Sequence, residues 1–202
     1  MPIDSHNQAT TLSRFGQHKI IPDLIQEETL LALSHYPELL DTRIRFMVVD
    51  PAIKGSVMQA QPGFASMLTP WRKRDYVIKV SRFFRGDSAQ IPIDEVPQNI
   101  LIGWIGHELG HIMDYVHRNS WELIRYGLGY VLSRKYLMKA ERRADLYAIG
   151  HGLGDKIVAT KNFILEHADL PERYKSKIRR LYLSPEETLL LIEEYQNKQV
   201  GW

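Results

Sequence analysis

The chain has 202 residues, a length that suits a single globular domain. Hydrophobic residues make up 44% and charged residues 25%, which is enough apolar material for a buried core, and a net charge of +2 gives no reason to expect nucleic acid as a partner. There is no cysteine, so disulfides and thiolate metal sites are excluded, and His, Asp and Glu are left as candidate ligands for a transition metal.

Residues 1–19 are polar and predict a flexible leader ahead of one domain that spans residues 20–202. The leader has no cationic segment followed by an apolar one, so we do not expect a secretory signal. No window of about 18 residues is apolar throughout, so we expect no membrane span, while peripheral association with a membrane stays open. A cytoplasmic location is the default expectation.

The first half of the chain predicts one helix and three strands. Residues 21–36 have the apolar spacing of an amphipathic helix that ends before Pro37. Residues 43–50, 54–63 and 74–84 have the composition of strands. Residues 85–98 read as turn and loop, with Asp94 as a possible N-cap.

From Asn99 onward the strand signal is lost and five segments predict helices: 98–118, 121–150, 155–168, 171–182 and 185–197. Ser184 and Glu187 are spaced as a capping box for the last helix. Glycines at 150, 152 and 154 break the chain between two helices. This order predicts an α+β fold, with a helix and a sheet in residues 20–98 and a helical part in residues 99–202.

One helical segment carries ionisable residues where apolar ones are normally found. His107 and His111 are four residues apart and therefore share one face of the predicted helix 98–118, inside the run GWIGHELGHIMDY. That spacing lets both imidazoles bind one metal ion, while Glu108 lies about 100° around the helix and can act as a general base on a metal-activated water. The sequence therefore predicts a metal site at these residues, in preference to a pair of exposed histidines beside a solvated glutamate.

A catalytic zinc site needs a third protein ligand, and the sequence offers two. His117 has the spacing of a metzincin ligand, but Asp114 stands where that pattern has glycine, and on an unbroken helix His117 would lie about 80° from the His107 face. Glu141 lies on a later helix that can return across the first. Asp145 is four residues further on the same face, where it could accept a hydrogen bond from a ligating imidazole. The alternative for Glu141 and Asp145 is a solvated helix with pairs to neighbouring arginines.

HELGH followed by ERRAD about 30 residues later resembles the gluzincin metallopeptidases, in the group that includes the CAAX-processing and heat-shock membrane proteases. The resemblance covers residues 103–150 and implies Zn²⁺ held by His107, His111 and Glu141, with Glu108 as catalytic base and Asp145 supporting a ligand. It also implies a zincin-like fold with a backing helix, a twisted sheet and an active-site helix. Residues 74–84 would then be the edge strand that pairs with an extended peptide substrate. Those proteases span membranes and this chain is not expected to, so their substrates are not carried over.

The group that stabilises the oxyanion is less defined by the sequence. Gluzincins often use a downstream His, Tyr or Arg, which makes His151 a candidate, although a histidine near a helix C-terminus is also favoured by the helix dipole. Residues 121–138 carry tyrosines and a tryptophan on an apolar background, and we expect them to form a core helix behind the metal site rather than a membrane-surface helix.

The function predicted is that of a zinc metallopeptidase, an endopeptidase rather than an exopeptidase. Three alternatives stay open: a catalytically silent, metal-stabilised binding or regulatory module of the same fold; a metzincin-type site that uses His117; and a latent enzyme whose leader 1–19 lies in the cleft.

Overall fold

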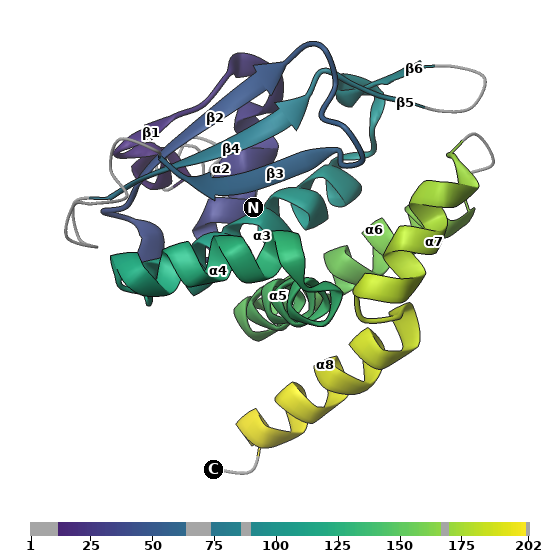
Figure 1. The fold of residues 1–202 in the computed structure, drawn as a ribbon. Coiled ribbons are helices and arrows are strands. Elements are labelled where there is room, and N and C mark those ends of the chain that lie inside the picture. Colours follow the sequence, from purple (N-terminus) through teal and green to yellow (C-terminus); the bar gives the residue numbers. More distant parts are fainter. Residues whose placement is uncertain (1–11, 64–73, 86–89, 167–169, 201–202) are drawn as a thin grey trace, which may run out of the picture.

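The computed structural model describes residues 12–63, 74–85, 90–166 and 170–200. Figure 1 shows a mixed α+β arrangement, with the strands in the first half of the chain and the helices after residue 98 packed below the sheet. The α+β prediction is confirmed at this level. Among the described helices, none combines the length and apolar character that crossing a bilayer requires.

The main sheet has the strand order β1-β2-β4-β3. Its strands are β1 (Lys19–Ile20), β2 (Arg43–Val49), β3 (Met58–Pro62) and β4 (Asp75–Ser81). β1, β2 and β4 run parallel to one another, whereas β3 is antiparallel to β4. We expected residues 74–84 to form the edge strand, and this is wrong: β4 lies between β2 and β3, and the edge strand beside it is β3.

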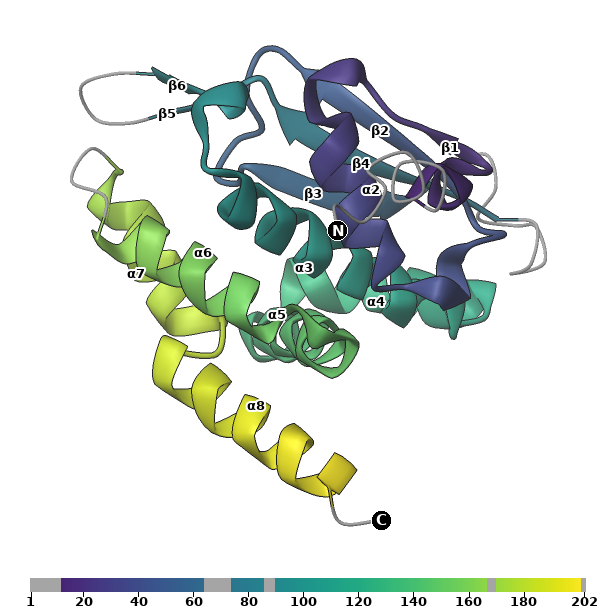
Figure 2. The ribbon, with the colours of Figure 1, turned by 180° about the vertical axis from the view of Figure 1, so that it is seen from behind.

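One face of the sheet is buried, as the alternation of side chains along its strands requires. The residues of this face include Ile44, Phe46, Tyr76, Ile78 and Val80. Figure 2 shows α2 (Gln26–Ser34) and α3 (Gln98–Val116) packed on it. A separate hairpin of β5 (Phe83–Arg85) and β6 (Gln90–Pro92) lies within the segments predicted as strand and loop.

The central helix is α3, in which every residue from Ile100 to Tyr115 is buried. It packs against α2 and β3 on one side and against α5 (Arg134–Ala148) and α6 (Gly154–Glu166) on the other. The contact with α5 is close because a Cβ at Gly110 would lie 2.4 Å from the carbonyl oxygen of Ala144. Only glycine fits at this crossing without moving a helix.

The helix predicted at 121–150 is two helices, α4 (Ser120–Leu132) and α5. The break falls at Ser133, whose backbone is extended and whose side chain accepts a hydrogen bond from Tyr136 N–H. The hydroxyl thereby caps the new helix. The apolar pattern runs through this point, which is why periodicity alone joined the two helices.

The remaining helices agree with the sequence pattern. α7 (Glu172–Leu181) and α8 (Pro185–Val200) follow α6, and Ser184 and Glu187 exchange the two hydrogen bonds of a capping box, at 2.7 and 3.1 Å. The glycine break is also present. Gly152 has φ of +78°, a left-handed conformation that glycine adopts without a steric cost.

Two predictions near the start of the chain and of α3 need correction. The leader is shorter than 1–19, because Phe15 is buried in the core and Lys19 belongs to β1. Residues 1–11, on which the latent-enzyme alternative depends, lie outside the described part of the chain. Asp94 is not an N-cap, because it lies in a 3₁₀ turn (Ile93–Glu95) and the residue at the N-cap of α3 is Pro97.

Candidate metal centre

Two helices bring the predicted ligands together. His107 and His111 lie one turn apart on α3, and Glu141 projects towards them from α5. Their ligand atoms all lie within 4.8 Å of one another, and all three residues are buried. Glu141 Oε2 is 3.1 Å from His107 Nε2 and 3.4 Å from His111 Nε2.

These separations fit a metal ion. Ligand atoms bound at about 2.0–2.1 Å to a tetrahedral ion lie about 3.3 Å from one another. Both distances from Glu141 Oε2 to the imidazole nitrogens are close to that value. Two imidazoles and one carboxylate are also a donor set that suits divalent transition metals. The three residues can therefore hold such an ion.

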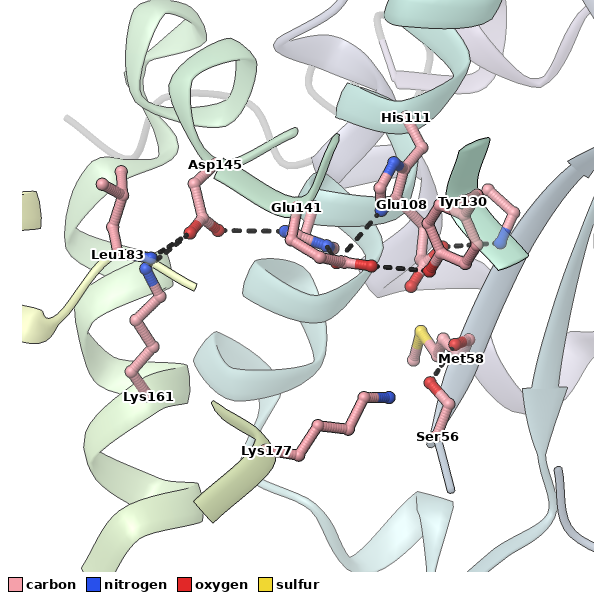
Figure 3. A network of polar contacts seen from close by, with 12 residues as sticks. Ser56, Met58, Glu108, His111, Tyr130, Glu141, Asp145, Lys161, Lys177 and Leu183 are labelled. Carbon is pink, nitrogen blue, oxygen red and sulfur yellow. Dashed lines mark hydrogen bonds and ion pairs between the residues drawn. The ribbon is translucent and has the colours of Figure 1, made fainter. Parts of the chain in front are cut away.

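Asp145 lies on the far side of His107 from Glu141. Its Oδ1 is 3.0 Å from His107 Nδ1. This hydrogen bond orients the imidazole ring so that its Nε2 faces Glu141. Its Oδ2 accepts a hydrogen bond from the Lys161 ammonium at 2.8 Å and from Leu183 N–H at 3.3 Å. Figure 3 shows this chain of contacts, which runs from Lys161 through Asp145 towards Glu141. The contact predicted between Asp145 and an imidazole of the HELGH motif is present, at His107.

The two carboxylates beside His107, those of Glu141 and Asp145, stabilise positive charge on its imidazole. Although burial opposes it, hydrogen bonds to Asp145 and Glu141 raise the pKa of His107 to about 10. Burial alone would raise the pKa of Glu141, but His111 and His107 hold it well below its usual range. The pKa of Asp145 is also lowered despite burial, by His107 and Lys161. Positive charge placed among these groups is stabilised.

Glu108 is beside the cluster but is not one of its ligands. Its Oε2 accepts a hydrogen bond of 2.6 Å from Ala60 N–H in β3, and burial raises the pKa of its carboxyl. The side chain therefore faces the edge strand, in the space between β3 and α3, as Figure 3 shows. A carboxylate in this position can accept a proton from a water bound nearby.

Sequence reasoning missed one residue that contacts the cluster, Tyr130, and one that contacts Asp145 behind it, Lys161. The Tyr130 hydroxyl donates a hydrogen bond of 2.6 Å to Glu141 Oε1, and burial followed by the Glu141 charge raises the pKa of Tyr130. Lys161, only 4% exposed, is the ion-pair partner of Asp145. Nothing in the local pattern marks Lys161, whereas Tyr130 lies among the tyrosines between the two motifs, a position from which a hydroxyl could reach the cluster.

A cleft of about 500 Å³ opens over the cluster, a volume typical of ligand-binding sites. Glu108, His111 and Glu141 form part of its lining. Its walls come from β3 and the residues before it, from α4 and from α7, and include Met58, Ala60, Leu123, Tyr126, Val131 and Lys177. The edge strand thus borders the cleft, with β3 in the place predicted for residues 74–84.

The outward-facing backbone of β3 is already bonded at two residues. Ala60 N–H donates to Glu108, and the Ala60 carbonyl accepts from the Tyr115 hydroxyl at 3.3 Å. The Met58 carbonyl accepts from the Ser56 hydroxyl. A peptide that added a strand along β3 would have to displace these bonds, of which the one from Tyr115 is the longest and therefore the weakest.

The structure separates two other histidines from the cluster. His117 is exposed at the C-cap of α3, which continues unbroken to Val116, so the chain does not turn back and the metzincin-type alternative is wrong. His151 stacks on Tyr36 and is hydrogen-bonded to the Tyr147 carbonyl and to Glu38. It is not among the residues that line the cleft, so the structure gives no support to an oxyanion role for it.

Comparisons with protein-family models, with curated proteins and with solved structures gave no match for this chain.

Proposed function

We propose that the protein is a zinc-dependent peptidase of gluzincin type on a zincin-like fold. The observation that carries the proposal is the convergence of His107, His111 and Glu141 to within 4.8 Å, beside a cleft that His111, Glu141 and Glu108 line. Three protein ligands leave one position of a tetrahedral ion for a water or a substrate. Structural zinc sites normally have four protein ligands, so this arrangement favours a catalytic role.

When bound, zinc would supply a Lewis acid that polarises the scissile carbonyl and makes a water acidic. Glu108 then takes the proton of the attacking water and passes it to the leaving amine. Asp145 orients His107 through Nδ1, and Tyr130 orients Glu141 through Oε1. The hydroxyls of Tyr115 and Tyr130 line the cleft and replace His151 as candidates to hydrogen-bond the developing oxyanion.

The substrate that this site suits is an extended peptide lying between β3 and α4. The cleft carries apolar and aromatic side chains along α4 and backbone groups along β3, which together recognise side chains and main chain of a strand-like peptide. The hydrogen bond from Tyr115 to Ala60 would open when such a peptide binds, which frees the Ala60 carbonyl for the substrate and the Tyr115 hydroxyl for the reacting carbonyl.

Glu108→Gln tests the role of the base. We expect zinc-loaded Glu108→Gln to keep its metal and to lose hydrolysis of a denatured proteome, with cleavage sites mapped by mass spectrometry. A variant that cleaves as fast as the wild type would contradict the mechanism. Wild-type protein that holds one zinc ion per chain but cleaves nothing would favour the catalytically silent binding module.

A matched pair of variants tests the ligands. Glu141→Ala should empty the site, measured as zinc per chain by elemental analysis after dialysis, because two imidazoles alone bind zinc weakly. His117→Ala should keep the metal, since this histidine is exposed and outside the cluster. Equal metal content in the two variants would exclude Glu141 as a ligand.

A further inference from the structure

Helix α4 exposes large apolar side chains to solvent. Trp121, Leu128, Val131 and Leu132 are 77%, 57%, 81% and 78% exposed, respectively, and we call these four residues the α4 patch. The core helix expected for residues 121–138 is therefore wrong for this face. Figure 1 shows α4 on the side of the molecule nearest the viewer, along the lower border of the sheet. Clustered exposed apolar residues of this size mark an interaction surface.

The patch is one continuous stripe. With 100° per residue, the Cα positions of Trp121, Leu128 and Leu132 lie within about 40° of one another around the helix, and Val131 borders them. On the other side of the helix, Leu123 and Tyr126 are buried against the core. α4 is thus apolar on two faces, of which the protein covers one. The other face, which carries the α4 patch, faces solvent, where a surface helix normally has polar and charged residues.

Basic residues accompany the patch. Arg125 lies within the stripe, and Arg134 and Lys135 follow it directly at the start of α5; all three are exposed. The exposed acid on α4 is Glu122, whose carboxylate is used in the capping box with Asn119 N–H. The patch therefore combines a tryptophan, three aliphatic side chains and a net positive charge.

The surface of α8 provides an internal contrast. Leu189 and Leu190 are 50% and 62% exposed, but their exposed neighbours Glu186, Glu193 and Glu194 are acidic. Both helices expose apolar residues, and they differ in the sign of the charge beside them. Attraction to an anionic surface is accordingly expected for α4 and not for α8.

We infer that the α4 patch docks on an anionic lipid bilayer. A tryptophan suits the interface between headgroups and acyl chains, aliphatic side chains enter the acyl region, and nearby cations add attraction to anionic lipid. Val131 and the exposed Gly127 also line the cleft, so docking places the mouth of the cleft at the lipid surface. The inference does not depend on peptidase activity, because it concerns binding alone.

Sedimentation of the full chain with vesicles tests the inference. We expect binding to vesicles of phosphatidylserine and phosphatidylcholine, weaker binding in high salt, and little binding to phosphatidylcholine alone. Trp121→Ser combined with Leu128→Ser should weaken binding about tenfold or more, because it removes the inserted apolar groups. Arg134→Gln combined with Lys135→Gln should weaken it about fivefold for each cation removed.

The matched control is Leu189→Ser combined with Leu190→Ser, which removes as many exposed apolar side chains from α8 and should leave vesicle binding unchanged. All substituted residues are exposed, so circular dichroism and the melting temperature should stay close to wild type. The inference is overturned if the wild type does not bind anionic vesicles or if the α8 variant loses binding as much as the α4 variant. It is also overturned if the chain forms a dimer that the α4 substitutions dissociate, because a second copy would then cover the patch.

Discussion

A single added methyl group should separate α3 and α5, the two helices that carry the candidate metal ligands. In Gly110→Ala the new Cβ would lie 2.4 Å from the Ala144 carbonyl oxygen and 3.1 Å from the Ala144 Cα, whereas ordinary contacts of a Cβ are 3.4–4 Å. The obstacle is backbone rather than a flexible side chain, so α3 and α5 must move apart by about 1 Å. Glu141 lies less than one turn from Ala144 and moves with α5.

The magnitude follows from two opposing effects. Overpacking of this kind costs about 1–3 kcal/mol, while replacing a helical glycine by alanine gains up to about 1 kcal/mol. We expect Gly110→Ala to lower the free energy of unfolding by about 1–2 kcal/mol in urea denaturation of the metal-free protein. Its zinc affinity, measured by competition with a chromogenic chelator, should fall about tenfold or more, because the third ligand is displaced.

Gly127→Ala is the control. A Cβ at Gly127 meets no atom within 4 Å, so the same substitution should raise the stability by up to about 1 kcal/mol and leave zinc affinity unchanged. Equal denaturation midpoints for Gly110→Ala and wild type would refute the reasoning about the helix contact. Normal zinc affinity in a destabilised Gly110→Ala would refute the link between that contact and the ligands.

Three further predictions concern the groups behind the ligands. Lys161→Met should lower the melting temperature and the free energy of unfolding by about 3 kcal/mol, because it leaves the buried Asp145 charge without its ion-pair partner; an unchanged melting curve would contradict it. Tyr130→Phe should lower zinc affinity about tenfold while the fold persists, because Glu141 loses a hydrogen bond, and unchanged affinity would show that this bond does not position the ligand. In a solution whose free zinc concentration is about a thousand times Kd, adding a chelator should lower the free energy of unfolding of the wild type by about 4 kcal/mol and leave that of Glu141→Ala unchanged. Equal changes in the two proteins would argue against the site.

Local patterns were sufficient for the parts of the fold that depend on local interactions. The spacing of His107 and His111 places both rings on one helical face, and the capping box of Ser184 and Glu187 marks the start of α8. The second motif indicates Glu141. Glu141 and Asp145 are four residues apart and share one face of a helix whose apolar residues lie on one side, so both carboxylates are candidates to contact the first motif.

Other features depend on contacts that no local pattern encodes. Strand order is one, because residues 74–84 have the composition of any half-buried strand and only the tertiary fold places β4 inside the sheet. The ion pair of Lys161 with Asp145 is another, because it joins two helices across the core. The exposed side of α4 is a third. Its apolar residues look like core residues in the sequence, and nothing in their spacing tells which of two apolar faces the protein covers.

The bonds that Asp145 receives also bear on when the site is completed during synthesis. His107, His111 and Glu141 are synthesised before Lys161 and Leu183, yet the Asp145 carboxylate that contacts His107 is itself fixed by hydrogen bonds from those two later residues. A nascent chain that ends before Lys161 contains all three candidate ligands but lacks these two hydrogen bonds to Asp145. Binding of a metal ion at these residues is therefore expected only after α6 and the segment that carries Leu183 have docked against α5.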